Sequence, residues 1–416
     1  MTQDKTMEFA LPLCRFVMLR TARNRNTLAV LHRIVREANV AGVVPEIATV
    51  CPCDLRCSDI VAYSFTTVDI DEIQKHLRYF APHEGPLRIA GGPHASADPE
   101  GCLAMGFDVV FVGEAEHTLP EFLRQWTQNP RRANVQPIWK SEVLCDLNAS
   151  VHADADTPEF PFLEISRGCA HACAFCQVPR LFGRHVRFRS PAQAAAGVAH
   201  AVAAGHRRIR CLTSDAFFYG GGNASHVAAS LRELVDACRN AGASYLMLGS
   251  FPSEVRPDHV TPELLEILAK ACANPTVVVG AQSGSDVVLK AMHRGHSVQD
   301  VVRAVMHIHD AGLIAHVDLL FSFPGETRAD RQATLDLGEW ILSLSRSRLH
   351  LHSYLPLPGI SAWPAAPEPL EPEIVARLRA WRRTKRVDGY WDHHVVQARR
   401  ILEHYKNNVI RITKNG

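Results

Sequence analysis

Apolar runs and amphipathic stretches alternate along the first 126 residues of the chain. Apolar residues recur with helical spacing over 27–38, 69–80, 98–106 and 118–126. Strands are predicted for the apolar runs between them: CRFVML (14–19), PEIATV (45–50), DIVAYS (59–64), LRIAGG (87–92) and FDVVFVG (107–113). Such an alternation, with strands that are apolar almost throughout, is typical of a parallel sheet covered by helices on both faces. We therefore expect an α/β domain over residues 1–130, with a doubly wound Rossmann- or flavodoxin-like sheet.

A second alternation of strands and helices begins at Phe162. Its predicted strands are FLEIS (162–166), RRIRCLTS (207–214), SYLMLGSF (244–251), TVVVGAQSG (276–284), IAHVDLLFSF (314–323) and RLHLHSYLPL (348–357). Each of the first five precedes a helical pattern, so residues 159–356 predict a second α/β domain of six βα units. Residues 131–158 are polar and non-periodic and predict a linker, whereas residues 357–416 predict a helical C-terminal extension.

Composition narrows the classes of partner and compartment. The chain has 416 residues with 45 Lys and Arg against 43 Asp and Glu, which argues against nucleic acid or an anionic membrane as the main partner. It has no run of about 18 apolar residues and no basic start followed by an apolar region, so we expect neither a membrane span nor a signal peptide. Its 12 cysteines do not predict a disulfide framework, and their tightest group has metal-cluster spacing, which favours a reducing cytoplasm.

That tightest group is Cys169, Cys173 and Cys176, in CxxxCxxC spacing directly after the run 162–166. A tight loop can bring three such thiolates to different irons of one inorganic cluster. Three protein ligands for four irons leave one iron open to a substrate or cofactor. An open coordination position is typical of catalytic rather than structural metal sites. The alternative interpretation is three small buried thiols.

With Phe175 between the last two cysteines, this motif resembles the CxxxCxΦC signature of radical S-adenosylmethionine (radical SAM) enzymes. The resemblance implies a 4Fe–4S cluster on Cys169, Cys173 and Cys176, with SAM chelating the fourth iron. It also implies reductive cleavage of SAM to a 5′-deoxyadenosyl radical, an electron donor such as flavodoxin or ferredoxin, and a partial TIM-like (β/α)6 barrel. The chemistry would then occupy the carboxyl ends of the barrel strands.

The resemblance implies two sets of groups for the methionine part of SAM. Ser214 and Asp215 follow the second barrel strand and match by position the segment that accepts hydrogen bonds from the ammonium group. Arg294, in GAQSGSDVVLKAMHRGHS (280–297), matches the family's fourth-strand segment and is expected to bind the carboxylate. The alternatives are a helix-capping role for Asp215 and a surface position for Arg294.

Further segments match the nucleoside part of SAM. Gln282 and Ser283 end the fourth strand and are expected to hydrogen-bond the ribose. Pro324 and Gly325, in DLLFSFPGET (318–327), predict a tight turn with little side-chain bulk, where the adenine could approach the backbone.

The stretch 89–123 resembles the cobalamin-binding-type domain fused to many radical SAM proteins. It lacks DxHxxG, the loop whose histidine ligates cobalt, so the alternatives are cobalamin without a histidine ligand or a fold that has lost the cofactor. A bound corrin is expected between three strand ends and the barrel mouth, where glycines let a flat ligand approach the backbone. The expected lining residues are Ser64, Phe65, Thr66, Gly92, His94, Gly113 and Glu114.

The motifs favour a cobalamin-dependent radical SAM methyltransferase acting on an unactivated carbon. One alternative is a methylthiotransferase, which the segment 280–297 favours and the C-terminal extension disfavours. In that case Cys51, Cys53 and Cys57 could hold a second cluster, although their spacing also fits incidental thiols in a loop. Another alternative is a non-catalytic iron–sulfur or cobalamin sensor, which would not need the SAM-binding groups. The substrate, a small molecule or a peptide, is not specified by any motif.

Overall fold

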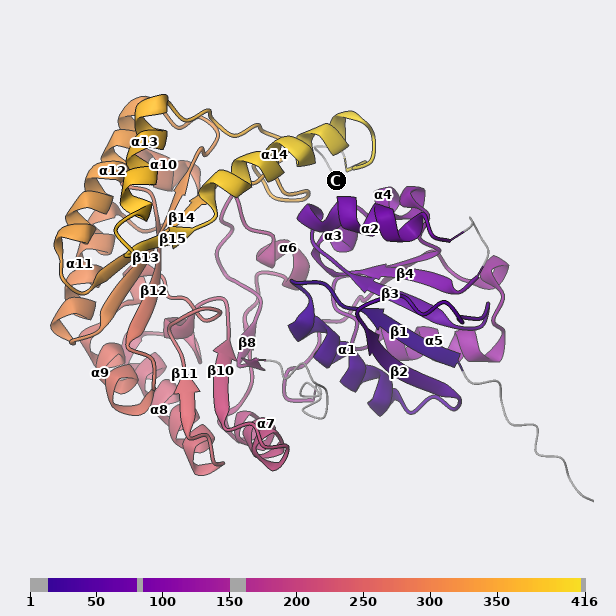
Figure 1. Cartoon of the computed structure of the whole chain (residues 1–416). Coiled ribbons are helices and arrows are strands. Elements are labelled where there is room, and N and C mark those ends of the chain that lie inside the picture. Colours follow the sequence, from indigo (N-terminus) through magenta and orange to yellow (C-terminus); the bar gives the residue numbers. More distant parts are fainter. Residues whose placement is uncertain (1–13, 81–84, 150–161, 413–416) are drawn as a thin grey trace, which may run out of the picture. The chain divides into compact units, whose positions relative to one another are not determined.

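The computed structural model describes residues 14–80, 85–149 and 162–412, which fold into two units divided between Cys145 and Asp146 (Figure 1). The division lies within the expected linker, of which residues 150–158 are outside the described residues. None of the helices in the described ranges is both long and apolar enough to cross a membrane.

The N-terminal unit contains one sheet of six parallel strands in the order β2-β1-β3-β4-β5-β6. The strands are β1 (Cys14–Leu19), β2 (Val43–Ala48), β3 (Ile60–Ser64), β4 (Leu87–Gly91), β5 (Val109–Val112) and β6 (Ile138–Lys140). The order reverses between β1 and β3, which is the topological switch point of a doubly wound sheet. The predicted α/β class is confirmed.

The helices of this unit include one that the sequence did not predict. They are α1 (Arg25–Ala38), α2 (Ile70–Leu77), α3 (Gly92–Ala97), α4 (Pro99–Met105) and α5 (Thr118–Gln128), with short 3₁₀ turns at Thr67–Asp69 and Arg132–Asn134. Helix α3 begins directly after β4 and has a proline in its first turn. The short β6 forms part of the expected linker. Its Trp139 is buried and stacks on Phe111 at 6.3 Å between ring centroids, which holds this strand against β5.

All six predicted strands of the second unit are present, and all pair in parallel. Together with β15, which was not predicted, they form two sheets, β11-β10-β7 and β12-β13-β14-β15. An isolated parallel bridge joins Val255, which follows β11, to Val279 of β12. The strands are β7 (Leu163–Glu164), β10 (Arg208–Leu212), β11 (Tyr245–Met247), β12 (Thr276–Gln282), β13 (Ile314–Phe321), β14 (Ser347–Ser353) and β15 (Val387–Gly389).

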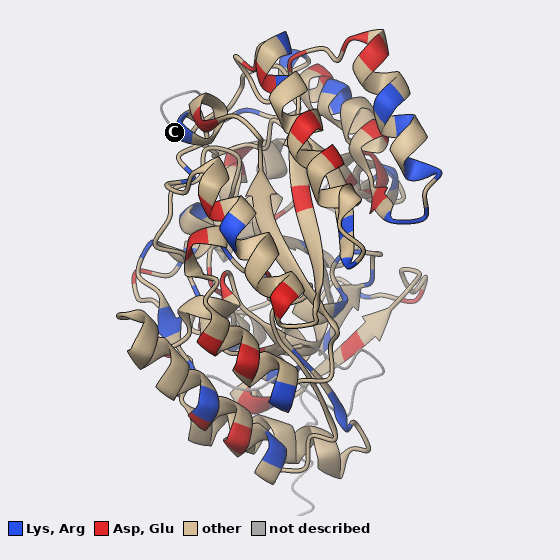
Figure 2. Ribbon diagram, turned by 90° about the vertical axis from the view of Figure 1, so that its left-hand side faces the viewer, with Lys and Arg blue, Asp and Glu red and all other residues tan. Residues whose placement is uncertain are grey.

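Most helices of this unit lie on the outer side of the arc that the strands form (Figure 1). The helices are α6 (Val178–Phe182), α7 (Pro191–Ala203), α8 (Ala224–Asn240), α9 (Pro262–Ala271), α10 (Asp286–Ala291), α11 (Val298–Asp310), α12 (Arg328–Ser343), α13 (Pro372–Arg382) and α14 (Trp391–Lys406), with 3₁₀ turns η3 (Ala216–Phe218) and η4 (Pro257–His259). In Figure 1 α6 and α14 lie away from that outer side. On the side shown in Figure 2 the helices carry both signs of charge, in keeping with the nearly balanced composition.

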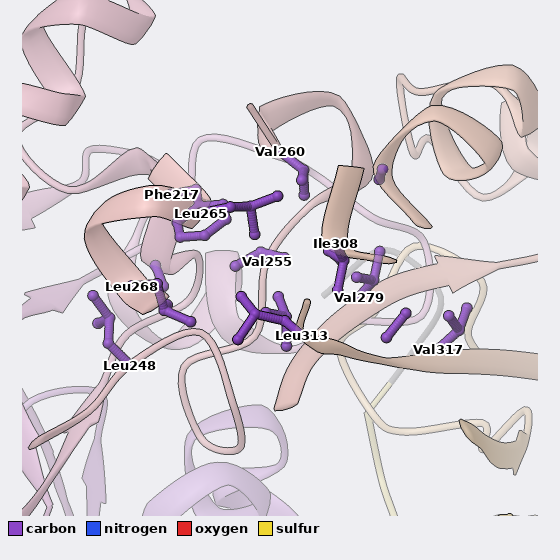
Figure 3. Close-up of a cluster of buried hydrophobic side chains, with 14 of the residues drawn as sticks. Phe217, Leu248, Val255, Val260, Leu265, Leu268, Val279, Ile308, Leu313 and Val317 are labelled. Atoms are coloured by element: carbon purple, nitrogen blue, oxygen red, sulfur yellow. The ribbon is translucent and has the colours of Figure 1, made fainter. Parts of the chain in front are cut away.

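The apolar core of this unit lies between the strands and the outer helices. Figure 3 shows one cluster of buried side chains in which Leu265 of α9 lies beside Phe217 and Ile308 of α11 lies beside Val279 of β12. Because side chains alternate along a strand, the residues between these core positions point to the other face, the interior of the arc.

The C-terminal extension is helical, as predicted, but it also extends the sheet. Helix α13 packs Leu378 and Trp381 into the core, and the chain then forms β15, whose Val387 is buried beside β14. A strand of three residues between two helices has no periodicity of its own, so no pattern in the sequence predicts it.

Candidate active site

The cysteine loop follows β8 (Ser166–Arg167), which pairs in antiparallel fashion with β9 (Arg187–Phe188) and so closes the loop at its base. Gly168 has φ +90°, and a Cβ atom there would lie 2.5 Å from the carbonyl oxygen of His185. The amide of Cys169 donates to the carbonyl of Gly183 at 3.2 Å. The base of the loop therefore tolerates only glycine at position 168 without moving the backbone.

The three thiols of this loop lie close enough to influence one another. Cys173 is buried, whereas Cys169, Cys176 and Phe175 are half-buried. Burial raises the pKa of Cys176 to about 11, and the thiols of Cys173 and Cys169 raise it further. Burial and the neighbouring Cys173 also raise the pKa of Cys169. Metal coordination removes thiol protons that such surroundings otherwise retain, so the group fits a metal cluster.

Arg294 joins the cysteine loop to the end of β12. Its Nη1 donates to the Sγ of Cys173 at 3.4 Å, and its Nη2 donates to the carbonyl of Gly280 at 2.6 Å. The side chain is buried, and its Nε has no hydrogen-bond partner among the described residues. Arg294 thus lies beside the cysteines rather than at the surface, and it retains a donor for a ligand.

Arg256 lies next to Arg294 and has the same property. Its Nε and Nη2 pair with the carboxylate of Asp258 at 3.1 and 3.0 Å, and Nη2 also donates to the backbone carbonyl of Arg294 at 2.5 Å. Its buried Nη1 has no partner in the described part of the chain. Desolvation, together with the charge of Arg256, lowers the pKa of His171, in the cysteine loop, to about 4. A buried donor without a partner costs about 1–3 kcal/mol, so two such cationic groups beside three thiols fit a bound anion such as a carboxylate.

Ser214 and Asp215 lie beside the cysteine loop, as their position after the second barrel strand suggested. The exposed Ser214 donates its hydroxyl hydrogen to the carbonyl of Gly168 at 2.7 Å. Asp215 is buried and accepts from the amide of Phe217 at 3.1 Å, which is the capping role that the sequence left open. Its other carboxylate oxygen lies 2.6 Å from Nδ1 of His259. An ammonium group bound here would share Asp215 with His259.

The two residues at the end of β12 differ in their surroundings. Gln282 has φ +71°, and a Cβ atom on Gly280 would lie 3.0 Å from its Nε2 and 3.2 Å from Nη2 of Arg294. Gln282 therefore flanks Gly280 together with Arg294. Ser283 is fully buried, and its hydroxyl lies 3.1 Å from that of Thr334 in α12. Its hydroxyl therefore fixes the loop to the helix, and the expectation that Ser283 binds a ribose stays a prediction.

The turn after β13 has the open backbone expected of it. Gly325 is exposed with φ +83°, and a Cβ atom there would have nothing within 4 Å. Pro324 is half-buried, and the amide of Gly325 donates to Glu368 at 2.9 Å. A planar base could approach this turn, and its contact with adenine stays a prediction.

Three ionisable residues besides Arg256 were not predicted for this site. They are His259, Glu254 and Asp318. Desolvation raises the pKa of both carboxyl groups, that of Asp318 well above its usual range. Carboxyl groups with raised pKa values are common in active sites. Asp318 interrupts an apolar strand, a signal that could have identified it; Glu254 and His259 carry no comparable signal.

The residues expected to line a corrin in the N-terminal unit mostly serve the packing of that unit. A Cβ atom on Gly92 would lie 2.8 Å from the hydroxyl of Ser64 and 3.0 Å from the amide of Phe65, so its missing side chain makes room for β3. Phe65 and His94 are buried with their rings 5.3 Å apart, and Nδ1 of His94 lies 3.2 Å from the hydroxyl of Thr67. The expected contact of these glycine and aromatic positions with a corrin stays a prediction.

The other expected lining residues also have partners within the unit. Thr66 donates to Asp69, Glu114 is buried and accepts from the amide of Cys145 at 2.7 Å, and the half-buried Gly113 donates to Ser96. The thiols of the loop between β2 and β3 are more accessible. Cys53 and Cys57 are exposed, and Cys51 is half-buried. Their exposure agrees with incidental thiols as well as with an open metal site.

Comparison with known proteins identifies the second unit. Residues 163–338 match the sequence model of the radical SAM superfamily. The second unit therefore contains a segment that is similar to radical SAM domains. The similarity implies an enzyme that uses a 4Fe–4S cluster and S-adenosylmethionine, and the matched segment contains Cys169, Cys173, Cys176 and Arg294.

Two curated relatives share the larger part of the chain. A tRNA-2-methylthio-N(6)-dimethylallyladenosine synthase of Mycolicibacterium smegmatis is 32% identical over 301 residues, which are 68% of this chain and 57% of that protein. An uncharacterized protein of Methanopyrus kandleri is 25% identical over 338 residues, covering 69% of this chain and 64% of its own. The chain therefore spans less than two thirds of the length of either relative.

Solved structures show the same fold. The radical SAM methyltransferase TsrM of Kitasatospora setae, solved with tryptophan and a SAM analogue, aligns with a TM-score of 0.59 and 18% identity over 83% of this chain and 73% of its own. The cobalamin-dependent radical SAM enzyme OxsB aligns with a TM-score of 0.58 and 16% identity over 79% of this chain and 52% of its own. Each of these two alignments covers a larger part of this chain than the second unit, residues 146–416, makes up. The likeness of fold therefore extends into the N-terminal unit.

Proposed function

We propose that this protein binds a 4Fe–4S cluster through Cys169, Cys173 and Cys176 and cleaves SAM reductively to a 5′-deoxyadenosyl radical. When bound and reduced by a donor such as flavodoxin or ferredoxin, the cluster supplies the electron for this cleavage. The observation that carries the proposal is the contact between Arg294 and Cys173, which brings a buried cation with a spare donor to the cysteine loop.

The two arginines of the site would bind the carboxylate of SAM. Both Nη atoms of Arg294 already have protein partners, so the available donors are its Nε and Nη1 of Arg256. In this proposal each arginine contributes one nitrogen, and a carboxylate can accept from both. Arg256 is thereby added to the set of SAM-binding residues that the sequence suggested.

The polar groups around the loop would orient the rest of SAM. Ser214 and Asp215 lie beside Gly168 and Cys169 and would receive the ammonium group, and Gln282 beside Arg294 would reach the ribose. The open turn at Pro324 and Gly325 would leave room for adenine. Glu254 and Asp318, whose pKa values are raised by desolvation, would hold protons on the substrate side.

The proposal extends to cobalamin and to methylation of an unactivated carbon. Its support is the fold shared with TsrM, which was solved with cobalamin and a [4Fe–4S] cluster, and with OxsB, solved with aqua-cobalamin. The residues that the sequence suggested for the corrin do not fit it well, because Gly92, Phe65 and His94 pack against their own domain. Cobalamin binding is therefore proposed from the shared fold alone, and no catalytic step is derived through it.

A methylthiotransferase is the second candidate, and the specific observation in its favour is 32% identity to the Mycolicibacterium smegmatis synthase. This candidate needs a second cluster, for which Cys51, Cys53 and Cys57 are the available thiols. They lie on the loop between β2 and β3, where two of them are exposed.

Anaerobic reconstitution with iron, sulfide and hydroxocobalamin distinguishes these candidates. The proposal predicts about four irons per chain, one retained cobalamin after desalting, and 5′-deoxyadenosine from SAM and a reductant. About eight irons, lost in part when Cys51, Cys53 and Cys57 are changed to Ala, would favour the methylthiotransferase. SAM cleavage without retained cobalamin would remove methyl transfer through cobalamin while leaving the radical SAM assignment in place.

A further inference from the structure

Three side chains that the proposed function does not use gather on the inner face of the last three strands. His316 lies on β13, His350 on β14 and Asp388 on β15. His350 pairs in register with Asp388, and also with Asp318, which is two residues after His316. Their strand neighbours Val317, Leu349 and Val387 belong to the core under the helices, so the three polar side chains point the other way, into the arc.

The potential ligand atoms of these residues converge on one point. Nε2 of His316 lies 3.3 Å from Oδ1 of Asp388, and Nδ1 of His350 contacts the same oxygen. All three ligand atoms lie within 4.8 Å of one another. Metal–ligand bonds of about 2.1 Å at a tetrahedral angle place two ligand atoms about 3.4 Å apart. A metal ion could therefore replace the proton between His350 and Asp388 if these two side chains moved slightly apart.

Neighbouring groups hold these side chains in place. Nη2 of Arg348 donates to the other oxygen of Asp388 at 3.4 Å, which leaves Oδ1 directed at the two imidazoles. The ring of His352 lies 4.4 Å from that of His350 and stacks on His394. Partners of this kind orient the ligands of metal sites.

The three side chains also stay reachable from solvent. Their exposed fractions are 17% for His316, 23% for His350 and 44% for Asp388. A hydrated ion can therefore enter the site.

We propose that His316, His350 and Asp388 bind a divalent transition-metal ion, zinc or iron(II), separate from the cysteine-bound cluster. Two imidazoles and one carboxylate leave coordination positions open, which is the composition of catalytic rather than structural sites. The open positions face the interior of the arc, the side on which Asp318 lies, so an oxygen atom of a bound substrate could complete the coordination. The proposal depends on neither the cluster nor SAM.

Metal content of the full-length, cluster-reconstituted protein tests this site. After dialysis against excess Zn²⁺ and then metal-free buffer, elemental analysis should find one zinc per chain in the wild type that is absent from both Asp388→Asn and His316→Gln. The matched controls are Asp392→Asn, an exposed aspartate on α14, and His309→Gln on α11, which should retain it. SAM binding should be unchanged in all four variants, because the cysteine-bound cluster stays intact.

X-ray absorption at the zinc edge of the wild type keeps the test decisive if a variant folds poorly. The expected shell contains two imidazoles and oxygen, at about 2.0–2.2 Å. A shell made of sulfur would assign the zinc to cysteines and overturn the proposal. Zinc retained equally by the wild type and both site variants, or by none of them, would overturn it as well.

Discussion

Replacement of Arg294 by Lys tests the SAM-binding role of the group that joins the cysteine loop to β12. The guanidinium of Arg294 serves Cys173, Gly280 and, in our proposal, the carboxylate of SAM through Nε. A lysine ammonium is a single point charge at the end of a flexible stem and cannot reach all three positions with one geometry.

The expected loss follows from the number of charge-assisted hydrogen bonds that Lys cannot replace. One such bond contributes about 1.5–3 kcal/mol, and every 1.4 kcal/mol is a factor of ten in affinity. If Lys keeps the contact with the Gly280 carbonyl and loses the ligand, the Kd for SAM should rise by about 10- to 100-fold. The positive charge stays, so cluster loading should fall less than SAM affinity.

Anaerobic calorimetry of SAM binding to the reconstituted protein, expressed per iron-loaded chain, measures this change. Arg303→Lys is the matched control, because Arg303 is a half-exposed arginine on α11 that pairs with Asp300. It should bind SAM like the wild type. An Arg294→Lys variant with full iron content and wild-type SAM affinity would refute the assignment of the carboxylate to Arg294.

Three further substitutions test the surroundings of the site. Burial raises the pKa of Glu326 from 4.5 to about 7. The protonated carboxyl group therefore stabilises the fold fully below about pH 4.5, and this stabilisation is lost as the pH rises through 7. Glu326→Gln should remove up to about 3 kcal/mol of this pH-dependent loss of stability, which would appear as a smaller difference between the urea midpoints at pH 5 and pH 8. Gly168→Ala should lower the cluster iron markedly, because the new Cβ atom would lie 2.5 Å from the carbonyl oxygen of His185. Gly205 is the matched control: it has φ +92°, but a Cβ atom there would have nothing within 4 Å. Gly205→Ala therefore shares the backbone strain without the clash and should keep its iron. Equal iron loss in both glycine variants would contradict this account. Ser283→Ala should leave SAM affinity unchanged and cost about 1–2 kcal/mol of stability through the lost contact with Thr334, and weakened SAM binding there would instead support the ribose role.

The regular elements could be predicted wherever apolar residues recur over five or more positions. The strand at 14–19 has the predicted bounds, and the six predicted strands of the second unit lie within their runs, except that β14 begins one residue earlier, at Ser347. The elements that escaped prediction include α3, α6, α10, β6, β9 and β15, which are short. A strand of three residues has no measurable period, and tertiary contacts such as the stacking of Trp139 on Phe111 decide whether it forms.

The candidate site could be predicted only as far as its residues are local in sequence. The cysteine spacing lies within eight residues, whereas Arg256 meets Arg294 through a contact across 38 positions and His316 meets Asp388 across 72. Such contacts depend on the register of strands that are not consecutive. Ser283 and Phe65 were assigned to ligands because they end strands, but a strand end does not reveal whether a side chain points to a ligand or into the core.

The most direct test of the central claim is the formation of 5′-deoxyadenosine from SAM by the reconstituted protein under reducing, anaerobic conditions. We expect the wild type to form 5′-deoxyadenosine. The triple variant Cys169→Ala, Cys173→Ala, Cys176→Ala should lose both the cluster iron and this product. Cys272 is a half-buried cysteine outside the loop, so Cys272→Ala should retain both. Product formation by the triple variant at the wild-type rate, or iron-loaded wild type that binds SAM and never cleaves it, would contradict the account.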